Sequence, residues 1–332
     1  MKNQLAISQY MDGITQGNIA IIGKAITLVE SSLPAHQELA QQIIELCLPL
    51  SGNSIRIGIT GVPGVGKSSF IEKFGLHLIE AEQKKVAVLA IDPSSSITGG
   101  SILGDKTRMD KLSVHPNAFI RPTAAGDSLG GVARKTRESI YICEAAGFDT
   151  ILIETVGVGQ SETAVHSMVD FFLLLMLSGA GDELQGIKRG IMEMADALVI
   201  TKADGDNAMK AKTAAVEYKR AMHLLPPHTA GWIAETTTCS SLTGEGMEEI
   251  WNIIEKYFRH CTSNGFIQHK RTEQARYWMD ETIQNELKQL FFEHPEVRSN
   301  YPLLLKQLDD GNITSYQAAH KIIALFKAAL RA

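Results

Sequence analysis

Residues 61–68 read Gly61-Val62-Pro63-Gly64-Val65-Gly66-Lys67-Ser68 and match the pattern G-x-x-x-x-G-K-[ST] at every fixed position. The preceding run, Ile55-Arg56-Ile57-Gly58-Ile59-Thr60, is typical of a buried strand, and residues 69–82 favour a helix. A strand, a Gly-rich loop and the first turn of a helix are the parts of a phosphate-binding loop. The stretch therefore predicts a site for a nucleoside triphosphate.

Each residue type in this loop has a chemical reason to be there. The glycines allow backbone N–H groups to turn inward around an anion, and the Lys67 ammonium can reach the β- and γ-phosphates. The Ser68 hydroxyl is placed to coordinate Mg²⁺. A Gly-rich turn before an ordinary helix is the alternative interpretation, and the flanking strand and helix argue against it.

The bulk composition excludes several classes of protein. The 332 residues include 32 basic and 37 acidic side chains, and a net charge of −5 is too mild to indicate nucleic acid or a membrane surface as partner. The four cysteines contain no C-x-x-C pair, which predicts reduced thiols rather than a disulfide framework or a zinc cluster. Residues 1–13 lack the apolar core of a signal peptide. We expect a cytoplasmic protein.

The order of apolar segments predicts the fold class. Two helices are expected in the segment 20–50, broken near Ser31-Ser32-Leu33-Pro34. Strands are expected at 55–60, 86–91, 150–154, 171–177 and 197–201, with a further one around 232–238, and helices between them. Near-continuous Val/Ile/Leu strands covered by helices indicate an α/β protein with a doubly wound, mainly parallel sheet. Ligands of such sheets bind at the carboxyl ends of the strands.

The pattern also suggests three parts: a helical extension over 1–53, a P-loop domain over 54–260 and a helical segment over 261–332. In the last part, one stripe comprises Met279, Ile283, Leu287, Leu290 and Phe291. Thr314 and Gln317 have the spacing of a capping box for a final helix. These stripes either pack within the chain or form a dimerisation arm.

Two predicted strands end in carboxylates. Asp92 follows the strand 86–91, and Glu154 ends the strand 150–154. A carboxylate at a strand end beside a phosphate loop can hold Mg²⁺ directly or through water. Taken alone, either residue could instead cap a helix or lie in a solvated turn. The polar, Gly-rich segment 94–108 contains Asp105 as a further metal candidate and suits a switch loop, although an ordinary surface loop is the alternative.

Glu154 also opens the run Glu154-Thr155-Val156-Gly157-Val158-Gly159-Gln160. An acid followed by flexible glycines suits a loop that senses the γ-phosphate and reorders on hydrolysis. The backbone N–H of Gly157 is the group that we expect to face that phosphate. Gln160 is a candidate to orient the attacking water.

The base is indicated by a second pair of segments. The strand 197–200 is followed by Thr201-Lys202-Ala203-Asp204, which resembles the guanine-specifying motif Asn-Lys-x-Asp with Thr in the first place. The Asp204 carboxylate can accept from the ring N–H and the amino group of guanine, and Lys202 can lie along the base. Ser240, Ser241 and Leu242 lie where a second loop would contact the guanine carbonyl through backbone N–H groups. The Thr departure removes one amide contact and weakens the assignment of GTP without reversing it.

Five linked motifs in order make a family resemblance that runs over essentially the whole chain. The motifs are residues 61–69, Asp92-Pro93-Ser94-Ser95, residues 99–108, the run 154–162 ending in Ser161-Glu162, and Gly179-Ala180-Gly181-Asp182-Glu183-Leu184-Gln185-Gly186. Together they resemble the MeaB/ArgK GTPases, bacterial relatives of the human methylmalonic aciduria type A protein.

This resemblance implies a P-loop GTPase of the SIMIBI class that chaperones adenosylcobalamin-dependent methylmalonyl-CoA mutase, gates cofactor loading and protects or reactivates the mutase. It implies GTP/GDP and Mg²⁺ as ligands, a homodimer joined through C-terminal helices, and nucleotide contacts from residues 61–69, including Ser69. It further implies that the segment 182–190 couples nucleotide state to the mutase, with Asp182 and Lys188 contributing to the stimulated hydrolysis, beside Lys67, Glu154 and Gln160 as the other catalytic candidates. Arg108 is a further candidate to neutralise charge at the γ-phosphate.

Three other functions stay open from the sequence. A nickel-insertion GTPase would need Cys or His ligands near a switch or at the N-terminus, and Cys143 and Cys239 have no adjacent Cys or His. A lysine/arginine/ornithine transport kinase, the older description of this family, would need an acceptor that the chain does not suggest. A nucleotide-gated scaffold shares the same switch chemistry.

Overall fold

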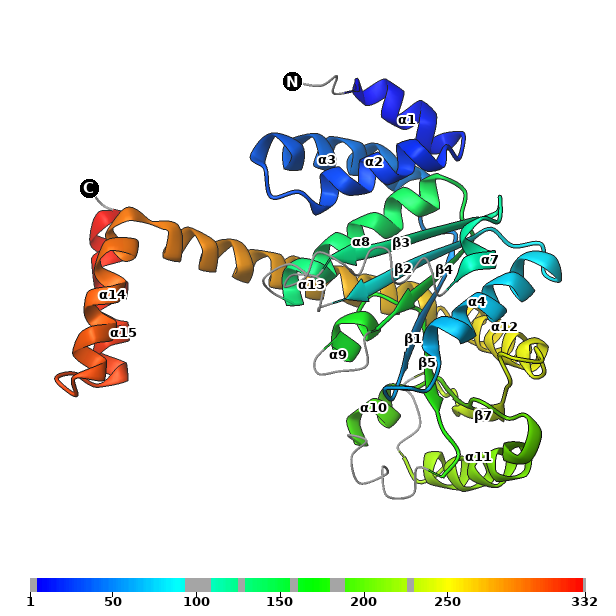
Figure 1. Ribbon diagram of the computed structural model, residues 1–332. Helices are drawn as coiled ribbons and strands as arrows, with labels where there is room; N and C mark the ends of the chain where they lie inside the picture. The colour runs from blue at the N-terminus through cyan, green and yellow to red at the C-terminus, as the bar shows by residue number, and fades with distance from the viewer. Residues whose placement is uncertain are drawn as a thin grey trace. The chain divides into compact units, whose positions relative to one another are not determined.

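The computed structural model describes residues 5–92, 109–124, 129–155, 161–179, 189–225 and 230–330 (Figure 1). The chain divides into two compact units, Met1–Gln274 and Ala275–Ala332. The first unit contains the sheet and the phosphate loop, and the second contains helices. In the described ranges no helix is both long enough and apolar enough to cross a membrane.

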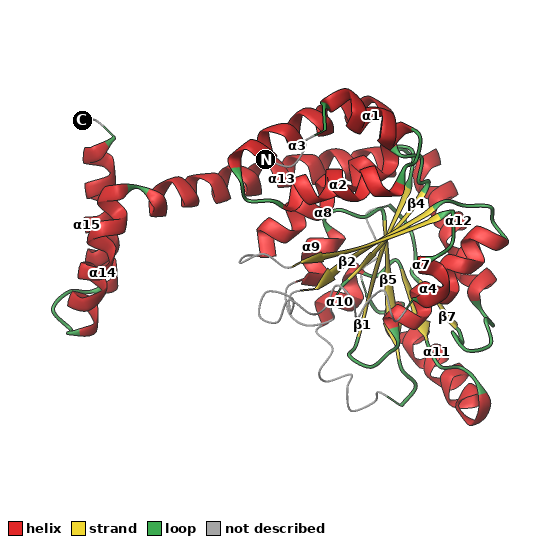
Figure 2. Ribbon diagram, turned by 45° about the horizontal axis from the view of Figure 1, so that its top comes forward, coloured by secondary structure: helices red, strands yellow, loops and turns green. Residues whose placement is uncertain are grey.

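The first unit is built on a seven-stranded sheet in which every pair of neighbouring strands is parallel (Figure 2). The strands lie in the order β3-β2-β4-β1-β5-β6-β7. Their bounds are β1 Ile55–Gly61, β2 Val86–Asp92, β3 Ala118–Ala124, β4 Thr150–Glu154, β5 Phe171–Met176, β6 Ala197–Ile200 and β7 Glu235–Thr238. The predicted doubly wound α/β fold is confirmed, and β1, which leads into the phosphate loop, lies in the middle of the sheet between β4 and β5.

Strand β3 was not predicted from the sequence. It carries Arg121 and Pro122, which interrupt the kind of apolar run that marks the inner strands β5 and β6. Its position at the edge of the sheet explains why proline is tolerated, because an edge strand leaves one row of backbone groups unpaired. Arg121 is held by an ion pair to Glu30 of α2, Ile19–Glu30. Tertiary contacts therefore stabilise a strand whose own sequence is a weak signal.

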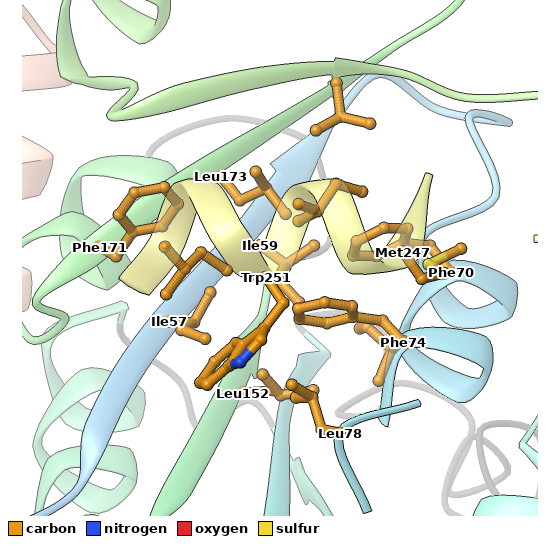
Figure 3. Close-up of a cluster of buried hydrophobic side chains, with 14 of the residues drawn as sticks. Ile57, Ile59, Phe70, Phe74, Leu78, Leu152, Phe171, Leu173, Met247 and Trp251 are labelled. Atoms are coloured by element: carbon orange, nitrogen blue, oxygen red, sulfur yellow. The ribbon is translucent and has the colours of Figure 1, made fainter. Parts of the chain in front are cut away.

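Helices cover both faces of the sheet, as the alternation of side chains along a strand requires. Phe171, Leu173 and Leu175 of β5 point to a core shared with α4, Lys67–Glu80, and α12, Met247–Ser263. Figure 3 shows this core, in which Trp251 of α12 and Phe74 of α4 lie among strand residues. The intervening β5 residues Leu174 and Met176 face a second core with α10, Arg189–Met194, and α11, Ala208–Met222.

Three helices precede β1, one more than the sequence predicted. They are α1 Ile7–Thr15, α2 Ile19–Glu30 and α3 Pro34–Cys47, followed by a short 3-10 turn at Leu48–Leu50. The predicted break near Pro34 is confirmed, since this proline opens α3. All three helices pack against α8, Leu129–Ala145, which itself lies on β2 and β3 (Figure 1). Helix α1 has only nine residues, and its stability comes from burying Tyr10 and Ile14.

The start of α13, Phe266–Glu293, is bonded to the amino-terminal ends of the strands, whereas the phosphate loop lies at their carboxyl ends. The Arg271 guanidinium pairs with the fully buried carboxylate of Asp170, at 2.8 and 2.6 Å, and donates to the carbonyl oxygens of Gly52 and Ser54. The same Asp170 carboxylate accepts from the Arg56 backbone N–H of β1 at 3.0 Å. The second turn of this helix is thus joined to the starts of β1 and β5.

The second unit comprises the rest of α13 with α14, Pro295–Asp309, and α15, Ser315–Ala329. The capping box predicted at the start of the last helix is confirmed, with Thr314 and Gln317 each bonding the other's backbone N–H. Phe291 packs edge-on against Phe326, with ring centroids 5.1 Å apart. The remaining α13 stripe stays open to solvent within one chain, with Met279, Ile283, Leu287 and Leu290 between 49% and 59% exposed.

Candidate nucleotide site

The phosphate loop connects the end of β1 to the start of α4. Gly61 is required by a close approach, because a Cβ at this position would clash with the carbonyl oxygen of Leu175 on the neighbouring strand. Gly66 has φ of 90°, in the left-handed region that favours glycine, and precedes the first residue of α4. Among the residues that the structure describes, no side chain caps this helix. Its first N–H groups can therefore receive an anion, and phosphate binding by this loop stays a prediction.

The Lys67 side chain folds back over its own loop. Its Nζ donates to the carbonyl oxygen of Gly61 at 2.9 Å. Burial lowers the pKa of Lys67, while the negative charges of Glu154 and Glu162 raise it in opposition. A cationic donor is thus held at the loop, where it can exchange a carbonyl oxygen for phosphate oxygens.

A hydroxyl and a carboxylate meet beside this lysine. The Ser68 Oγ donates to Glu154 Oε1 at 3.2 Å. Glu154 reaches this place because β4 pairs with β1 in parallel register, with Glu154 opposite Ile59. Hard oxygen ligands of this kind suit Mg²⁺, so the two residues fit the ion that the sequence predicts. Asp92 ends β2 on the other side of β4, and the placement of its side chain, like all of Asp105, lies outside the described part of the chain.

The base motif is tied to the phosphate loop by two side chains. Lys202, itself at a positive φ of 56°, donates from Nζ to the carbonyl oxygen of Gly64 at 2.8 Å. Thr201 is 1% exposed, and its hydroxyl donates to the carbonyl oxygen of Val65 at 2.8 Å. The Thr at the first motif position therefore has a structural contact of its own, which connects the end of β6 to the phosphate loop.

The two predicted base segments lie together. The Ser240 hydroxyl donates to Asp204 Oδ2 at 2.5 Å, and the backbone N–H of Ala203 donates to the carbonyl of Cys239 at 3.0 Å. The Ser240 oxygen also accepts from the backbone N–H groups of Leu242 and Thr243, at 3.2 and 3.1 Å. A compact turn thus holds the Asp204 carboxylate next to the segment 240–242. Contacts of Ser241 and Leu242 to a guanine carbonyl remain predictions.

Several predicted residues fall where the structure makes no statement. Gly157, Gln160, Asp182, Lys188 and Arg108 all lie outside the described ranges, and their roles stay predictions. Glu162 is the residue that sequence reasoning passed over. It belongs to the quoted run 154–162, yet no role was assigned to it. In the structure Glu162 is 4% exposed, and its negative charge raises the pKa of Lys67. Its only sequence signal is an acidic residue shortly after a predicted switch loop.

Comparison with known proteins narrows the interpretation. The family model described as "Methylmalonyl Co-A mutase-associated GTPase MeaB" matches residues 22–296. The chain is 50% identical over 313 residues to a "Putative GTPase" of Caulobacter vibrioides, covering 94% of this chain and 95% of that protein. It is 42% identical over 337 residues to the "Methylmalonic aciduria type A homolog, mitochondrial" of Mus musculus, and the match covers 98% of this chain and 81% of that protein. The protein in a crystal structure of an "LAO/AO transport system kinase" is 35% identical in sequence. The two structures superpose with a TM-score of 0.78, and the match covers 98% of this chain and 99% of that chain.

Proposed function

Since this chain belongs to the MeaB family of methylmalonyl-CoA mutase-associated GTPases, we propose that it is a Mg²⁺-dependent GTPase that chaperones an adenosylcobalamin-dependent methylmalonyl-CoA mutase. GTPase activity follows from the family itself. The client, the gating of cofactor loading and the residue roles are the proposed part. The main support is that the contacts of Lys202 with Gly64 and of Thr201 with Val65 join a phosphate loop and a guanine-type motif into one site.

The side chains of this site have distinct proposed roles. Lys67 exchanges the Gly61 carbonyl for β- and γ-phosphate oxygens, and Asp204 accepts from the guanine edge. Ser68 and Glu154 hold Mg²⁺, which neutralises phosphate charge when bound. Phosphoryl transfer depends on positioning and electrostatics, the sequence suggests no strong general base beside the phosphate loop, and Gln160 is a candidate to orient water. We therefore expect slow hydrolysis by the protein alone.

A partner can complete such a site. We propose that the mutase orders the segment 182–190, so that Asp182 and Lys188 stabilise the charge that develops during hydrolysis. The test measures GTP hydrolysis with and without the mutase, with ATP in place of GTP as a control. Stimulation with GTP alone is expected. Equal rates with and without mutase would refute the proposed partner.

Variants separate binding from stimulation. Lys67→Ala should abolish measurable GTP binding, and unchanged affinity would contradict the proposed site. Asp182→Ala and Lys188→Ala should keep the unstimulated rate and lose most of the stimulation. Lys210→Ala, an exposed lysine at the start of α11, is the matched control and should leave both rates unchanged. Loss of the unstimulated rate in the first two variants would mean that these residues act without the partner.

One similar crystal structure is described as a transport system kinase, and the same assay can test that alternative. Transfer of labelled phosphate from GTP to a protein acceptor would favour a kinase, whereas release of inorganic phosphate supports the GTPase. A nickel-insertion role has less support. All four cysteines are buried free thiols, and no cluster of three potential metal ligands occurs among the described residues. The reduced thiols also support the proposed cytoplasmic location.

We also propose that the chain is a homodimer joined through its C-terminal helices. The exposed stripe on α13 supports this proposal, because leucine, isoleucine and methionine in one row on a helix usually find a partner surface. Leu287 is 59% exposed, and Leu287→Glu would place a charge in that row. We expect light scattering to report a dimer for the unmodified protein and a monomer for Leu287→Glu. A monomer before substitution would refute the proposal.

A further inference from the structure

Glu162 is a buried acid that the proposed hydrolysis does not use. It lies in the first turn of α9, Ser161–His166, directly after the segment predicted as a switch loop. The residue is 4% exposed, and its Oε2 has no hydrogen-bond donor among the described residues. Burying a carboxylate oxygen without a donor is costly, so such a group usually serves a purpose beyond stability.

The position of α9 directs this carboxylate toward the phosphate loop. Val165 lies so close over β1 that a Cβ on Gly58 would come within 2.9 Å of it. Glu162 precedes Val165 by three residues and therefore lies on the same helix face, one turn earlier. Because α9 follows β4, its start is at the carboxyl edge of the sheet. The carboxylate is thereby brought toward the end of β1, where Lys67 donates to Gly61.

Two groups of negative charge therefore compete for the Lys67 ammonium: the neighbouring acids and the phosphates of a bound nucleotide. In the absence of nucleotide, burial disfavours the charge of this ammonium, and the negative charges of Glu154 and Glu162 favour it. Nucleotide binding draws the ammonium to the phosphates and places their negative charge near the same acids. Glu154 is expected to be neutralised by Mg²⁺, whereas Glu162 is not one of the proposed metal ligands, and its Oε2 has no hydrogen-bond donor among the described residues.

We propose that Glu162 is a positioning residue that draws the Lys67 ammonium away from the phosphates and thereby speeds nucleotide release. The inference rests on the proposed contact between Lys67 and the phosphates. It predicts a gain rather than a loss: removing the negative charge should tighten binding, since both its attraction for Lys67 and its repulsion of phosphate disappear. A merely structural role predicts the reverse, because a damaged site binds more weakly.

The test is the dissociation rate of fluorescent methylanthraniloyl-GDP, chased with excess GDP in the presence of Mg²⁺. Glu162→Gln and Glu162→Met should both release it more slowly, by roughly threefold to thirtyfold, which lies within the range of couplings between residues of one charged network. The Met variant guards against a folding defect, because an apolar side chain of similar length requires no hydrogen bond. Glu162→Asp keeps the charge and should release GDP at nearly the unmodified rate.

Two controls make the outcomes separable. Glu45→Gln, on the exposed face of α3, changes the net charge equally and should not alter release. Lys67→Ala tests the contact on which the inference depends: if it binds GDP normally, the proposed site itself is wrong. If Lys67→Ala loses affinity while the Glu162 variants release GDP at the unmodified rate or faster, the role of Glu162 is refuted. Faster release that is restored by high Mg²⁺ would instead assign Glu162 to the metal.

Discussion

Thr201→Val removes the hydroxyl that joins the base motif to the phosphate loop while keeping the shape of the side chain. In the protein this hydroxyl donates to the Val65 carbonyl at 2.8 Å, and Thr201 and Val65 are each 1% exposed. The other acceptor of the hydroxyl, the Met176 carbonyl at 3.3 Å, keeps a partner in the variant, because it also accepts the backbone N–H of residue 201 at 2.8 Å. The substitution therefore leaves one buried carbonyl, that of Val65, without its hydrogen-bond donor.

That single loss sets the size of the effect. A buried acceptor left without its donor costs about 1–3 kcal/mol, so we expect the free energy of unfolding to fall by about 2 kcal/mol. Part of this free energy holds the phosphate loop in place. GTP and GDP affinities should then fall by the same factor, roughly threefold to thirtyfold. The ratio of GTP to ATP affinity should not change, because discrimination is assigned to Asp204.

Urea unfolding followed by tryptophan fluorescence measures the first effect, since Trp232 and Trp251 are buried in the core of the first unit. Competition with a fluorescent nucleotide measures the second. The control is Thr213→Val on α11, whose hydroxyl bonds the Met209 carbonyl at an exposed site and whose loss should change neither quantity. If Thr201→Val is as stable as the unmodified protein and binds GTP equally well, the connection between the loops has no energetic role. A changed GTP to ATP ratio would mean that Thr201 reads the base.

Three further results are expected. Asp204→Asn should weaken GTP binding by about 100-fold or more, through two lost charge-assisted hydrogen bonds, and favour xanthosine triphosphate, whose C2 oxygen can accept from the new amide; competition binding decides this. Arg271→Ala should lower the free energy of unfolding by about 3–5 kcal/mol, because it removes the ion partner of fully buried Asp170, whereas exposed Arg259→Ala should change it little; equal urea midpoints would contradict this. Burial raises the pKa of the Cys239 thiol to about 12, so native protein at pH 8 should resist thiol reagents, and rapid labelling would refute this expectation. The free energy of unfolding should also decline above about pH 9, where the thiol ionises only in the unfolded chain.

Most of the sheet could be predicted because its strands are buried on both faces. Strand β5 is entirely apolar, and β1 and β4 are rich in isoleucine and leucine, which is the pattern that an inner parallel strand requires. Strand β3 and helix α1 could not be predicted in this way. The first contains Arg121 and Pro122 and depends on its place at the sheet edge, and the second is too short to be stable without the helices it packs on.

The candidate site, like the sheet, has parts that the sequence predicts and parts that depend on the tertiary structure. The sequence alone determined the phosphate loop, the acid at the end of β4 and the guanine-type motif, because each needs particular residue types at fixed spacing within a short segment. Only the tertiary structure decided how these segments meet. Parallel register brings Glu154 to Ser68, the hydroxyl of Thr201 reaches the loop 136 residues earlier in the chain, and α9 buries Glu162 toward Lys67. Contacts between distant segments depend on strand order and helix packing, and no local pattern of residues encodes either.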